Sequence, residues 1–299
     1  MRLSTSTNIC AFAPGGRKNL MPYAIRACAE AGYQVLDLNF CEAMNPTSRL
    51  RADDWEQYVD ELGVLGEQLG VEYPQCHLPY YDLFAPSAAE KRDVMEPLIL
   101  RSLRAAAKLG VKWAVTHPST VYSAGQDMAA STRANYEYYA PYVEEAARLG
   151  IGIALENDFE YRSAPYQRIY CASCYELVDL VDSFASGTVG VCYDFGHANL
   201  VGGFHRKDLN VIGSRLRAVH VQDNCGISDS HVMPFFGSTD WADAMAGLAD
   251  IRYEGDLTYE IQEFGRYLPN ELKPEMLKLS VAVGRYLISL YEKALGEKE

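Results

Sequence analysis

Short apolar segments alternate with longer amphipathic segments along the whole chain. The apolar segments have the length of strands that are buried on both faces, and they cover residues 3–10, 33–38, 72–77, 112–116, 151–155, 189–193, 217–221 and 257–261. The spacing of apolar residues between them predicts helices over residues 20–31, 53–69, 87–109, 131–149, 175–184, 206–216, 241–249 and 273–295. Glycine, which ends helices readily, follows four of them as Gly32, Gly70, Gly110 and Gly150.

These segments make eight strand–helix units. Alternating strands and helices indicate an α/β protein with a parallel sheet, and eight units in 299 residues favour a closed (β/α)8 TIM barrel over an open sheet. Neither a change in composition nor a linker divides the chain. We therefore expect residues 1–299 to form a single domain.

Composition and charge narrow the class of partner. Apolar residues make up 48% of the chain and the net charge is −13, whereas a protein that binds duplex DNA usually presents a basic surface. A nucleic-acid partner is therefore not expected. No signal peptide or stretch of about 20 apolar residues is present, which argues against a membrane protein. The eight cysteines are scattered, which suggests a reducing cytoplasm, and the lone C-x-x-C of Cys171 and Cys174 is interpreted as two loop cysteines.

Ligand-type side chains gather where the predicted strands end. They are His77, His117, Glu156, Asp194, His197, His220, Asp229, His231 and Glu260. In a barrel of this kind, the carboxyl ends of all strands face one mouth, where the active site lies. Of the six histidines, only His205 is not near a strand end, and we interpret it as structural or solvated.

The densest group lies in residues 219–241, VHVQDNCGISDSHVMPFFGSTDW. This stretch holds the imidazoles of His220 and His231 and the carboxylates of Asp223, Asp229 and Asp240. Such groups stay solvated unless a cation gathers them. Farther along the rim, Glu156 and Glu260 come from different strands, so that both could bind one cation and still face opposite sides of a substrate.

Asp194 and His220 would complete a set of four oxygen and nitrogen ligands with the two glutamates. This set suits one Mn²⁺, Zn²⁺, Co²⁺ or Mg²⁺, and the sequence does not select among these metals. The remaining strand-end residues could support these ligands, contact the substrate or hold further metal ions. They are His77, His117, His197, Asp229 and His231.

The order of the strand-end motifs resembles the xylose-isomerase-like superfamily of TIM barrels, and in particular the sugar phosphate isomerase/epimerase family. The motifs are CHLPYY, THPS, ALEN, YDFGHANL, VHVQDN, DSHVMPFFGSTDW and TYEI, and they span residues 76–261. Within that family the chain is similar to ketose 3-epimerases and inosose dehydratases. The resemblance implies a small sugar or cyclitol as substrate and a role in carbohydrate metabolism.

The resemblance to ketose epimerases also implies specific roles. It implies that Glu156, Asp194, His220 and Glu260 bind one divalent ion, and that Glu156 and Glu260 exchange protons with the substrate through an enediolate. The three-zinc apurinic endonucleases share the fold, and the nine strand-end residues fall where that family places its ligands. A phosphodiesterase that resembles these endonucleases and holds two or three zinc ions therefore remains an alternative, as do a sugar or cyclitol dehydratase and a metal-binding subunit without catalysis.

Several other residues could line the site. Phe235 and Phe236 stand where many relatives have a Pro-Gly-x-Gly turn, and they could form a wall against the substrate or pack as part of a loop. Aromatic residues that follow strand ends suit sugar rings: Tyr80, Tyr81, Phe84, Tyr161, Tyr166 and Tyr170. Basic candidates are few, Arg162 and Arg168 being the best, so a phosphorylated substrate is not expected. The last helix could cover the barrel bottom or form a homo-oligomer.

Overall fold

Among the residues that the structure describes, eight short strands lie in the middle of the molecule, and most of their residues are buried. In chain order they are β1 (Leu3–Ser6), β2 (Val35–Asn39), β3 (Glu72–His77), β4 (Trp113–Thr116), β5 (Gly152–Glu156), β6 (Val189–Asp194), β7 (Leu216–His220) and β8 (Leu257–Tyr259). The computed structural model describes residues 1–12, 20–122, 128–161 and 167–297.

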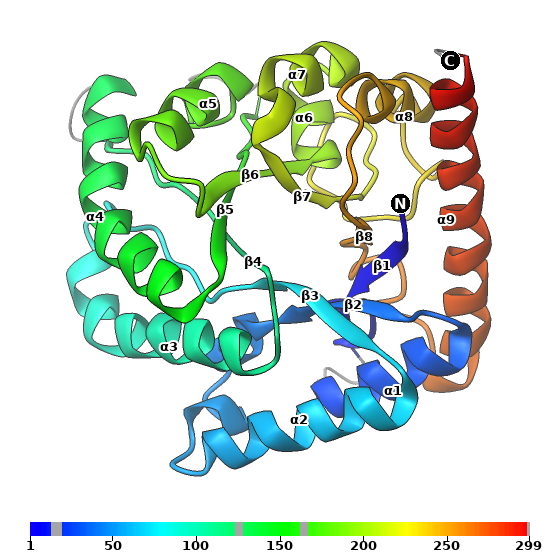
Figure 1. Ribbon diagram of the computed structural model, residues 1–299, viewed down its shortest axis with the longest axis horizontal. Helices are drawn as coiled ribbons and strands as arrows, with labels where there is room; N and C mark the ends of the chain where they lie inside the picture. The colour runs from blue at the N-terminus through cyan, green and yellow to red at the C-terminus, as the bar shows by residue number, and fades with distance from the viewer. Residues whose placement is uncertain (13–19, 123–127, 162–166, 298–299) are drawn as a thin grey trace.

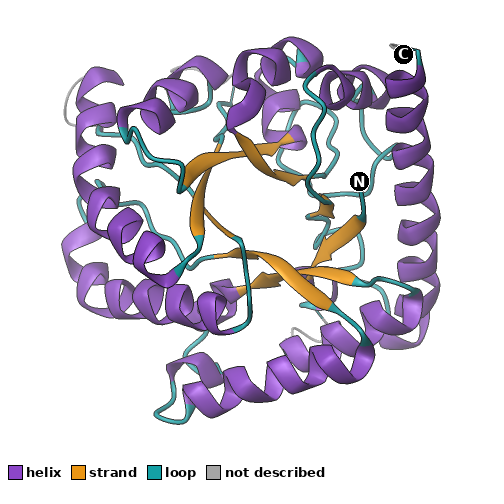
Figure 2. Cartoon of the chain, in the orientation of Figure 1, coloured by secondary structure: helices purple, strands orange, loops and turns teal. Residues whose placement is uncertain are grey.

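The strands form one parallel sheet that curls into a barrel. Each strand pairs with the next one along the chain from β1 to β7, and β8 pairs with β1. A parallel bridge between Val221, just after β7, and Tyr259 of β8 joins the two ends of the sheet. Figures 1 and 2 show the strands around a central axis, with the helices outside them. The predicted (β/α)8 barrel is confirmed.

Helices connect the strands and cover the outer face of the barrel. The α-helices of the described residues are α1 (Met21–Ala31), α2 (Trp55–Leu69), α3 (Ala88–Lys108), α4 (Met128–Leu149), α5 (Cys174–Ser183), α6 (Phe195–Val201), α7 (His205–Ile212), α8 (Trp241–Asp250) and α9 (Lys273–Gly296). Short 3-10 helices are η1 (Thr7–Cys10), η3 (Phe40–Met44), η4 (Arg49–Arg51), η6 (Gly213–Arg215) and η7 (Asn270–Leu272). None of the described helices combines the length and apolar composition of a membrane span.

Three details differ from the sequence-based expectations. The first strand ends at Ser6 rather than at Cys10, because the Ser6 hydroxyl accepts a hydrogen bond from the backbone N–H of Asn8 and starts η1. The helix expected over residues 206–216 ends at Ile212, before Gly213, which has a φ of 55°. Helix α6 was not expected, and Asp194 caps it by accepting from the N–H of His197.

The position of α9 bears on the expectation that the last helix covers the barrel bottom or forms a homo-oligomer. This helix packs on the outer side of the barrel against α1, α8 and β1, rather than across the barrel bottom. Figure 1 shows it in red along one edge of the molecule. The expectation of a helix that covers the bottom was therefore wrong, while a role in a homo-oligomer stays a prediction.

The inside of the barrel explains how the strand-end side chains are aimed. Val115, Ala154, Cys192 and Ala218 pack together there, with Trp113 against them. Each of the four lies two residues before a ligand-type residue, namely His117, Glu156, Asp194 and His220. Alternate residues of a strand face the same side. The small apolar cluster therefore fills the middle of the barrel, and the four polar side chains point inward above it.

Candidate metal centre

The nine strand-end residues predicted from the sequence come together at the carboxyl ends of the strands. His77, Glu156, Asp194 and His220 are the last residues of β3, β5, β6 and β7, and the others lie in the segments that follow a strand. Potential ligand atoms lie within 4.8 Å of one another in three groups that include all nine residues. The groups are Glu156 with Asp194, His220 and Glu260; His77 with His117 and Glu156; and His197 with Asp229 and His231.

The central group contains the four residues predicted to bind one divalent ion. Nδ1 of His220 lies 2.9 Å from Oε1 of Glu156 and 3.4 Å from Oε2 of Glu260. Glu156, Asp194 and His220 are fully buried. Oε2 of Glu156 and Oδ2 of Asp194 have no hydrogen-bond partner among the described residues. Buried carboxylate oxygens without partners, gathered with an imidazole, fit a divalent cation.

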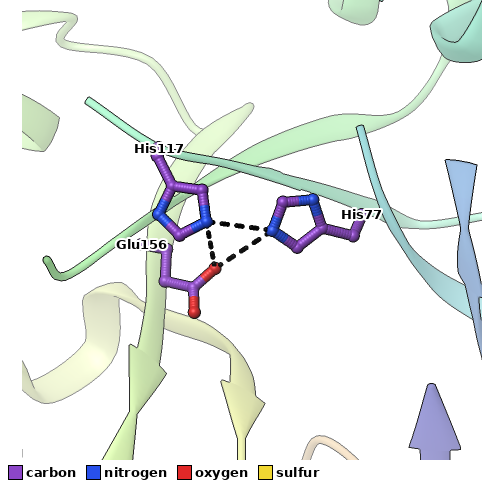
Figure 3. Close-up of side chains that lie close together, drawn as sticks. All are labelled: His77, His117 and Glu156. Atoms are coloured by element: carbon purple, nitrogen blue, oxygen red, sulfur yellow. Dashed lines mark hydrogen bonds and ion pairs between the residues drawn. The ribbon is translucent and has the colours of Figure 1, made fainter. Parts of the chain in front are cut away.

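The second group lies beside the first and shares Glu156 with it. Figure 3 shows His77 and His117 aimed at this carboxylate. Their Nε2 atoms lie 3.5 and 3.4 Å from Oε2 of Glu156 and 3.1 Å from each other. Burial lowers the pKa of His117 to about 3. Because the ring of His117 is therefore neutral near pH 7, its Nε2 can offer a lone pair to a metal ion or hydrogen-bond a substrate hydroxyl.

The third group lies in α6 and the loop after β7. Oδ2 of Asp229 is 2.7 Å from Nε2 of His231 and 3.5 Å from Nε2 of His197. Burial disfavours the charged form of each ring, but the contact with Asp229 outweighs it and raises the pKa of His231 to about 9. The two rings in turn hold the pKa of Asp229 well below its usual range, although burial acts in the opposite direction.

Backbone carbonyls orient three of these histidines. Nδ1 of His77 lies 2.8 Å from its neighbour's carbonyl, that of Leu78, and Nδ1 of His197 lies 2.9 Å from the carbonyl of Asn157. Nδ1 of His231 lies 2.9 Å from the carbonyl of Glu260. A carbonyl oxygen only accepts, so each Nδ1 carries the proton and each Nε2 faces the carboxylates. Such a contact fixes the tautomer of a metal-binding histidine.

The surroundings of Asp194 and Glu156 shift the pKa values of these two carboxylates in opposite directions. Burial raises the pKa of Asp194 to about 7. Burial also favours the neutral form of Glu156, but the imidazole of His220 outweighs it and brings the pKa of Glu156 well below its usual range. Carboxylates with such different surroundings are common at functional sites.

A cavity of about 960 Å³ opens above these groups at the mouth of the barrel. Its floor includes His77, His117, His197, Asp229, His231 and Glu260, and its walls include Tyr80, Tyr122 and Phe159. The described lining residues carry the carboxylates of Glu42, Asp82, Asp158, Asp229 and Glu260, but neither lysine nor arginine. The ring of Tyr80 lies 4.6 Å from that of His117. The cavity thus offers hydrogen-bonding groups and aromatic faces, without a fixed cation on its described lining.

Several expected site residues do not join this centre. The four hydrogen bonds to Asp223 come from the N–H groups of Asn224, Phe235, Thr239 and Trp241. Its carboxylate therefore holds the loop together, and the expectation that it helps to gather a cation was wrong. Phe235 packs against Tyr286 and Phe236 against Phe264, and neither is among the lining residues of the cavity. Of the two roles considered for them, the structure supports the packed loop.

Of the remaining basic and aromatic candidates, two line the cavity and the other described ones make contacts outside it. Arg168 is ion-paired with Glu160 and Glu176. Tyr81 and Tyr80 line the cavity, whereas the Tyr170 hydroxyl bonds to Thr132 and the Tyr161 ring packs on Phe159. Phe84 packs against the core. Tyr166 and Arg162 lie outside the described residues.

Cys41 is among the residues that line the cavity, whereas His205 and the other seven cysteines are not. None of the eight cysteines, all of which are described, forms a disulfide, and neither Cys171 nor Cys174 belongs to a potential metal group of the described residues. His205 is fully buried and its Nδ1 lies 3.2 Å from the Tyr193 hydroxyl, so it is structural rather than solvated. Cys192, by contrast, is grouped with Glu156 and His220.

Sequence reasoning missed some residues of the site. Cys192 lies two residues before Asp194, and the alternation of β6 could have revealed it. Asn8 follows β1, and its Nδ2 donates to Oε1 of Glu260 at 3.2 Å. Asp158 lines the cavity, and burial raises its pKa to about 6. Both follow strand ends, but an asparagine is not a usual metal ligand, and at the fifth strand Glu156 is already the ligand-type residue of the strand end.

Sequence comparison identifies a family over most of the chain. The family described as xylose isomerase-like TIM barrel matches residues 25–279, which confirms the resemblance drawn from the motifs. The uncharacterized protein y4fM of Sinorhizobium fredii is 32% identical over 121 residues, which are 40% of this chain and 36% of that protein. The chain covers 36% and 62% of the lengths of the two curated relatives that it matches.

Solved structures resemble the protein over nearly its whole length. A D-tagatose 3-epimerase-like protein has a TM-score of 0.74 and 21% identity, with coverage of 100% of this chain and 99% of that chain. A D-psicose 3-epimerase, solved in the presence of D-fructose, has a TM-score of 0.73 and 16% identity, with coverage of 96% and 99%. At this level of identity, the likeness shows that the barrel fold is shared.

Proposed function

Since the chain belongs to the xylose isomerase-like TIM barrel family, we propose that it is a divalent-metal-dependent epimerase or isomerase of an unphosphorylated ketose, related sugar or cyclitol. The observation that carries this proposal is the central group of Glu156, Asp194, His220 and Glu260, whose ligand atoms lie within 4.8 Å of one another. Two glutamates from different strands meet there at the floor of a cavity that is large enough for a sugar.

The four side chains of this group are the residues that would hold the metal ion. Their mixture of three carboxylates and one imidazole suits Mn²⁺, Co²⁺, Zn²⁺ or Mg²⁺. A divalent ion in this position would polarise a substrate carbonyl and make the neighbouring carbon-bound proton easier to remove. The buried carboxylate oxygens without hydrogen-bond partners, on Glu156 and Asp194, support such a site.

The two glutamates are the groups that we infer to exchange protons with the substrate. Glu260 lines the cavity, and Asn8 holds its Oε1 by a hydrogen bond of 3.2 Å. Glu156 lies deeper, and its Oε2 faces His77 and His117, which themselves line the cavity. One carboxylate would remove the proton beside the carbonyl to give an enediolate, and the other would return a proton to the opposite face. The carbon is inverted by this sequence.

The lining of the cavity supports an uncharged substrate. Phosphate groups are usually bound by arginine, lysine or helix N-termini, and the described lining residues include no basic side chain other than histidine. Amide, hydroxyl and carboxylate groups instead suit the hydroxyls of a polyol, as in Asn8, Asn39, Thr120 and Asp158. The structural neighbours named D-tagatose 3-epimerase-like protein and D-psicose 3-epimerase agree with this class.

The test is hydrogen exchange with solvent. Protein loaded separately with Mn²⁺, Co²⁺, Mg²⁺ and Zn²⁺ is incubated in D₂O with a panel of unphosphorylated ketoses and cyclitols, and the products are analysed by NMR and mass spectrometry. We expect deuterium at the inverted carbon of at least one substrate. A product lighter by one water would indicate a dehydratase instead. Bound metal without any exchange or turnover across the panel would contradict the proposal and favour a non-catalytic metal-binding subunit.

A second candidate rests on the other two groups of ligands. The groups of His77, His117 and Glu156 and of His197, Asp229 and His231 adjoin the central one, so the site could hold two or three zinc ions and cleave a phosphodiester, as the apurinic endonucleases do. The acidic lining of the cavity favours the sugar reaction over this one. Plasma mass spectrometry of metal per chain and incision of a duplex with an abasic site would separate the two. Three zinc ions together with incision would establish the nuclease.

A further inference from the structure

We propose that Asp37 is a positioning residue that holds the metal-facing orientation of His220 from inside the barrel. This inference rests on the proposed function in one respect, because it takes His220 to be a metal ligand. Asp37 belongs to β2, and its carboxylate lies near Nε2 of His220, the ring nitrogen opposite the one that contacts Glu156 and Glu260. It was not among the candidates that the sequence suggested, since it lies within a strand rather than at its end.

The contact joins buried atoms of Asp37 and His220 that have no hydrogen-bond partner among the described residues. Asp37 and His220 are both fully buried. Among the described residues, neither Asp37 oxygen has a hydrogen-bond partner, and Nε2 of His220 has none either. Oδ2 of Asp37 lies 3.7 Å from this Nε2. An ionised carboxylate in such surroundings is costly unless a positive or donating group faces it, and the Nε2–H of His220 is that group.

The opposite nitrogen of His220 faces the metal centre. Its Nδ1 lies 2.9 Å from Oε1 of Glu156 and 3.4 Å from Oε2 of Glu260. The ring also stacks on His77, with centroids 5.7 Å apart and planes 12° from parallel. The imidazole therefore bridges a carboxylate inside the barrel and the ligand group at its mouth. A proton on Nε2 leaves the lone pair of Nδ1 free for a cation.

His220 differs from the other histidines of the site in the ring nitrogen that it presents to the ligand group. His77, His197 and His231 each bind a backbone carbonyl through Nδ1 and present Nε2. His220 presents Nδ1, and a carboxylate takes the place of the carbonyl. A carboxylate behind a metal-binding histidine both fixes its tautomer and raises its basicity, and losing such a partner typically weakens metal binding by about 10- to 100-fold. At 3.7 Å the contact exceeds a direct hydrogen bond, so the charge of Asp37 is the property that matters.

The decisive variant is Asp37→Asn, which keeps the shape of the side chain and removes its charge. Affinity for Zn²⁺ and Mn²⁺ is measured by competition with a chromophoric chelator, and the expected result is a roughly 10- to 100-fold loss. Gln75→Leu is the matched control: Gln75 is the neighbour of Asp37 on β3, is buried, and also has a side-chain nitrogen without a partner among the described residues. It should leave metal affinity unchanged. An Asp37→Asn protein that binds both metals as tightly as the wild type would overturn the proposal.

A second measurement does not depend on metal or turnover. In metal-free protein with ¹⁵N-labelled histidine, we expect the Nε2 of His220 to carry a proton and its resonance to move in Asp37→Asn but not in Gln75→Leu. An unprotonated Nε2 in the wild type would refute the positioning role. This readout also separates the two proposals: if the wild type binds no divalent metal, the proposed function fails, whereas the state of the His220 ring still decides the role of Asp37.

Discussion

Nδ1 of His220 lies 2.9 Å from Oε1 of Glu156, and both side chains are fully buried at the ends of β7 and β5. The strands that carry them are not neighbours, since β6 lies between them. Inward-facing strand ends bring the two groups together across the mouth of the barrel. The cluster of carboxylates around them would repel itself if no positive group were present, and the imidazole supplies one contact of opposite charge. A divalent ion would supply a stronger one.

Metal addition should therefore stabilise the folded protein. An ion that binds only the native state at 100 times its Kd adds about 2.7 kcal/mol to the free energy of unfolding. We expect the Tm measured by calorimetry to rise with Mn²⁺, Co²⁺ or Zn²⁺ and to fall again with a chelator. Asp194→Asn should remove most of the rise. Asp60→Asn, which changes an exposed carboxylate paired with Lys108, serves as its control. A Tm that none of these metals changes would argue against the central site.

Turnover should depend on both glutamates. Glu156→Gln and Glu260→Gln are each expected to lower kcat by a factor of about 10² or more, because each would remove one of the two groups proposed to transfer protons. Glu263→Gln is a matched control, since Glu263 is ion-paired with Arg266 and is not among the lining residues of the cavity. The rates are measured by deuterium exchange with the best substrate. Full activity in either of the first two variants would refute its assignment.

The sequence predicted the barrel and its rim well, for identifiable physical reasons. The strands are buried on both faces and therefore form continuous apolar segments, and Gly32 and Gly70 end their helices with left-handed φ values of 107° and 66°. Strand ends in a barrel share one mouth, so the nine ligand-type residues could be assigned to one site before the structure was known.

What the sequence did not predict depends on local hydrogen bonds or on the barrel interior. The four N–H groups that bind Asp223 come from the loop of residues 224–241, and their convergence is visible only in three dimensions. Asp37 lies inside a strand, where a polar residue gives no sign of whether it faces the axis or the helices. Helix α6 has only seven residues, too few for a clear periodic pattern.

Acid should destabilise the protein through His205. Burial lowers the pKa of this ring to about 4, while an exposed histidine has a pKa of about 6.5. The unfolded chain therefore binds the proton first as the pH falls, and the contribution of His205 to stability is complete above about pH 6.5 and lost progressively down to about pH 4. The loss amounts to about 3 kcal/mol.

The variant His205→Phe tests this effect because it keeps a ring beside Phe195 and cannot titrate. Free energies of unfolding are measured in urea at several values between pH 4 and pH 7. The expected result is a shallower fall with acid than in the wild type, whatever the stability of the variant at pH 7. Parallel curves for the two proteins would show that His205 does not titrate as the structure implies.

A methyl group added at Gly152, inside the barrel, should destabilise the folded protein. A Cβ built there would lie 2.2 Å from the Trp113 ring, and the guanidinium of Arg217 also lies over this ring, 5.4 Å from its centroid. Because Trp113 also packs on the small apolar cluster inside the barrel, it has little room to move. Gly152→Ala is expected to lower the free energy of unfolding by about 1–3 kcal/mol, as overpacked cores do. Gly187→Ala is the control, since nothing lies within 4 Å of its Cβ position, and it should change stability by no more than about 0.5 kcal/mol. Equal urea midpoints for the two variants would mean that the strands can shift apart and that Trp113 does not fix the width of the barrel.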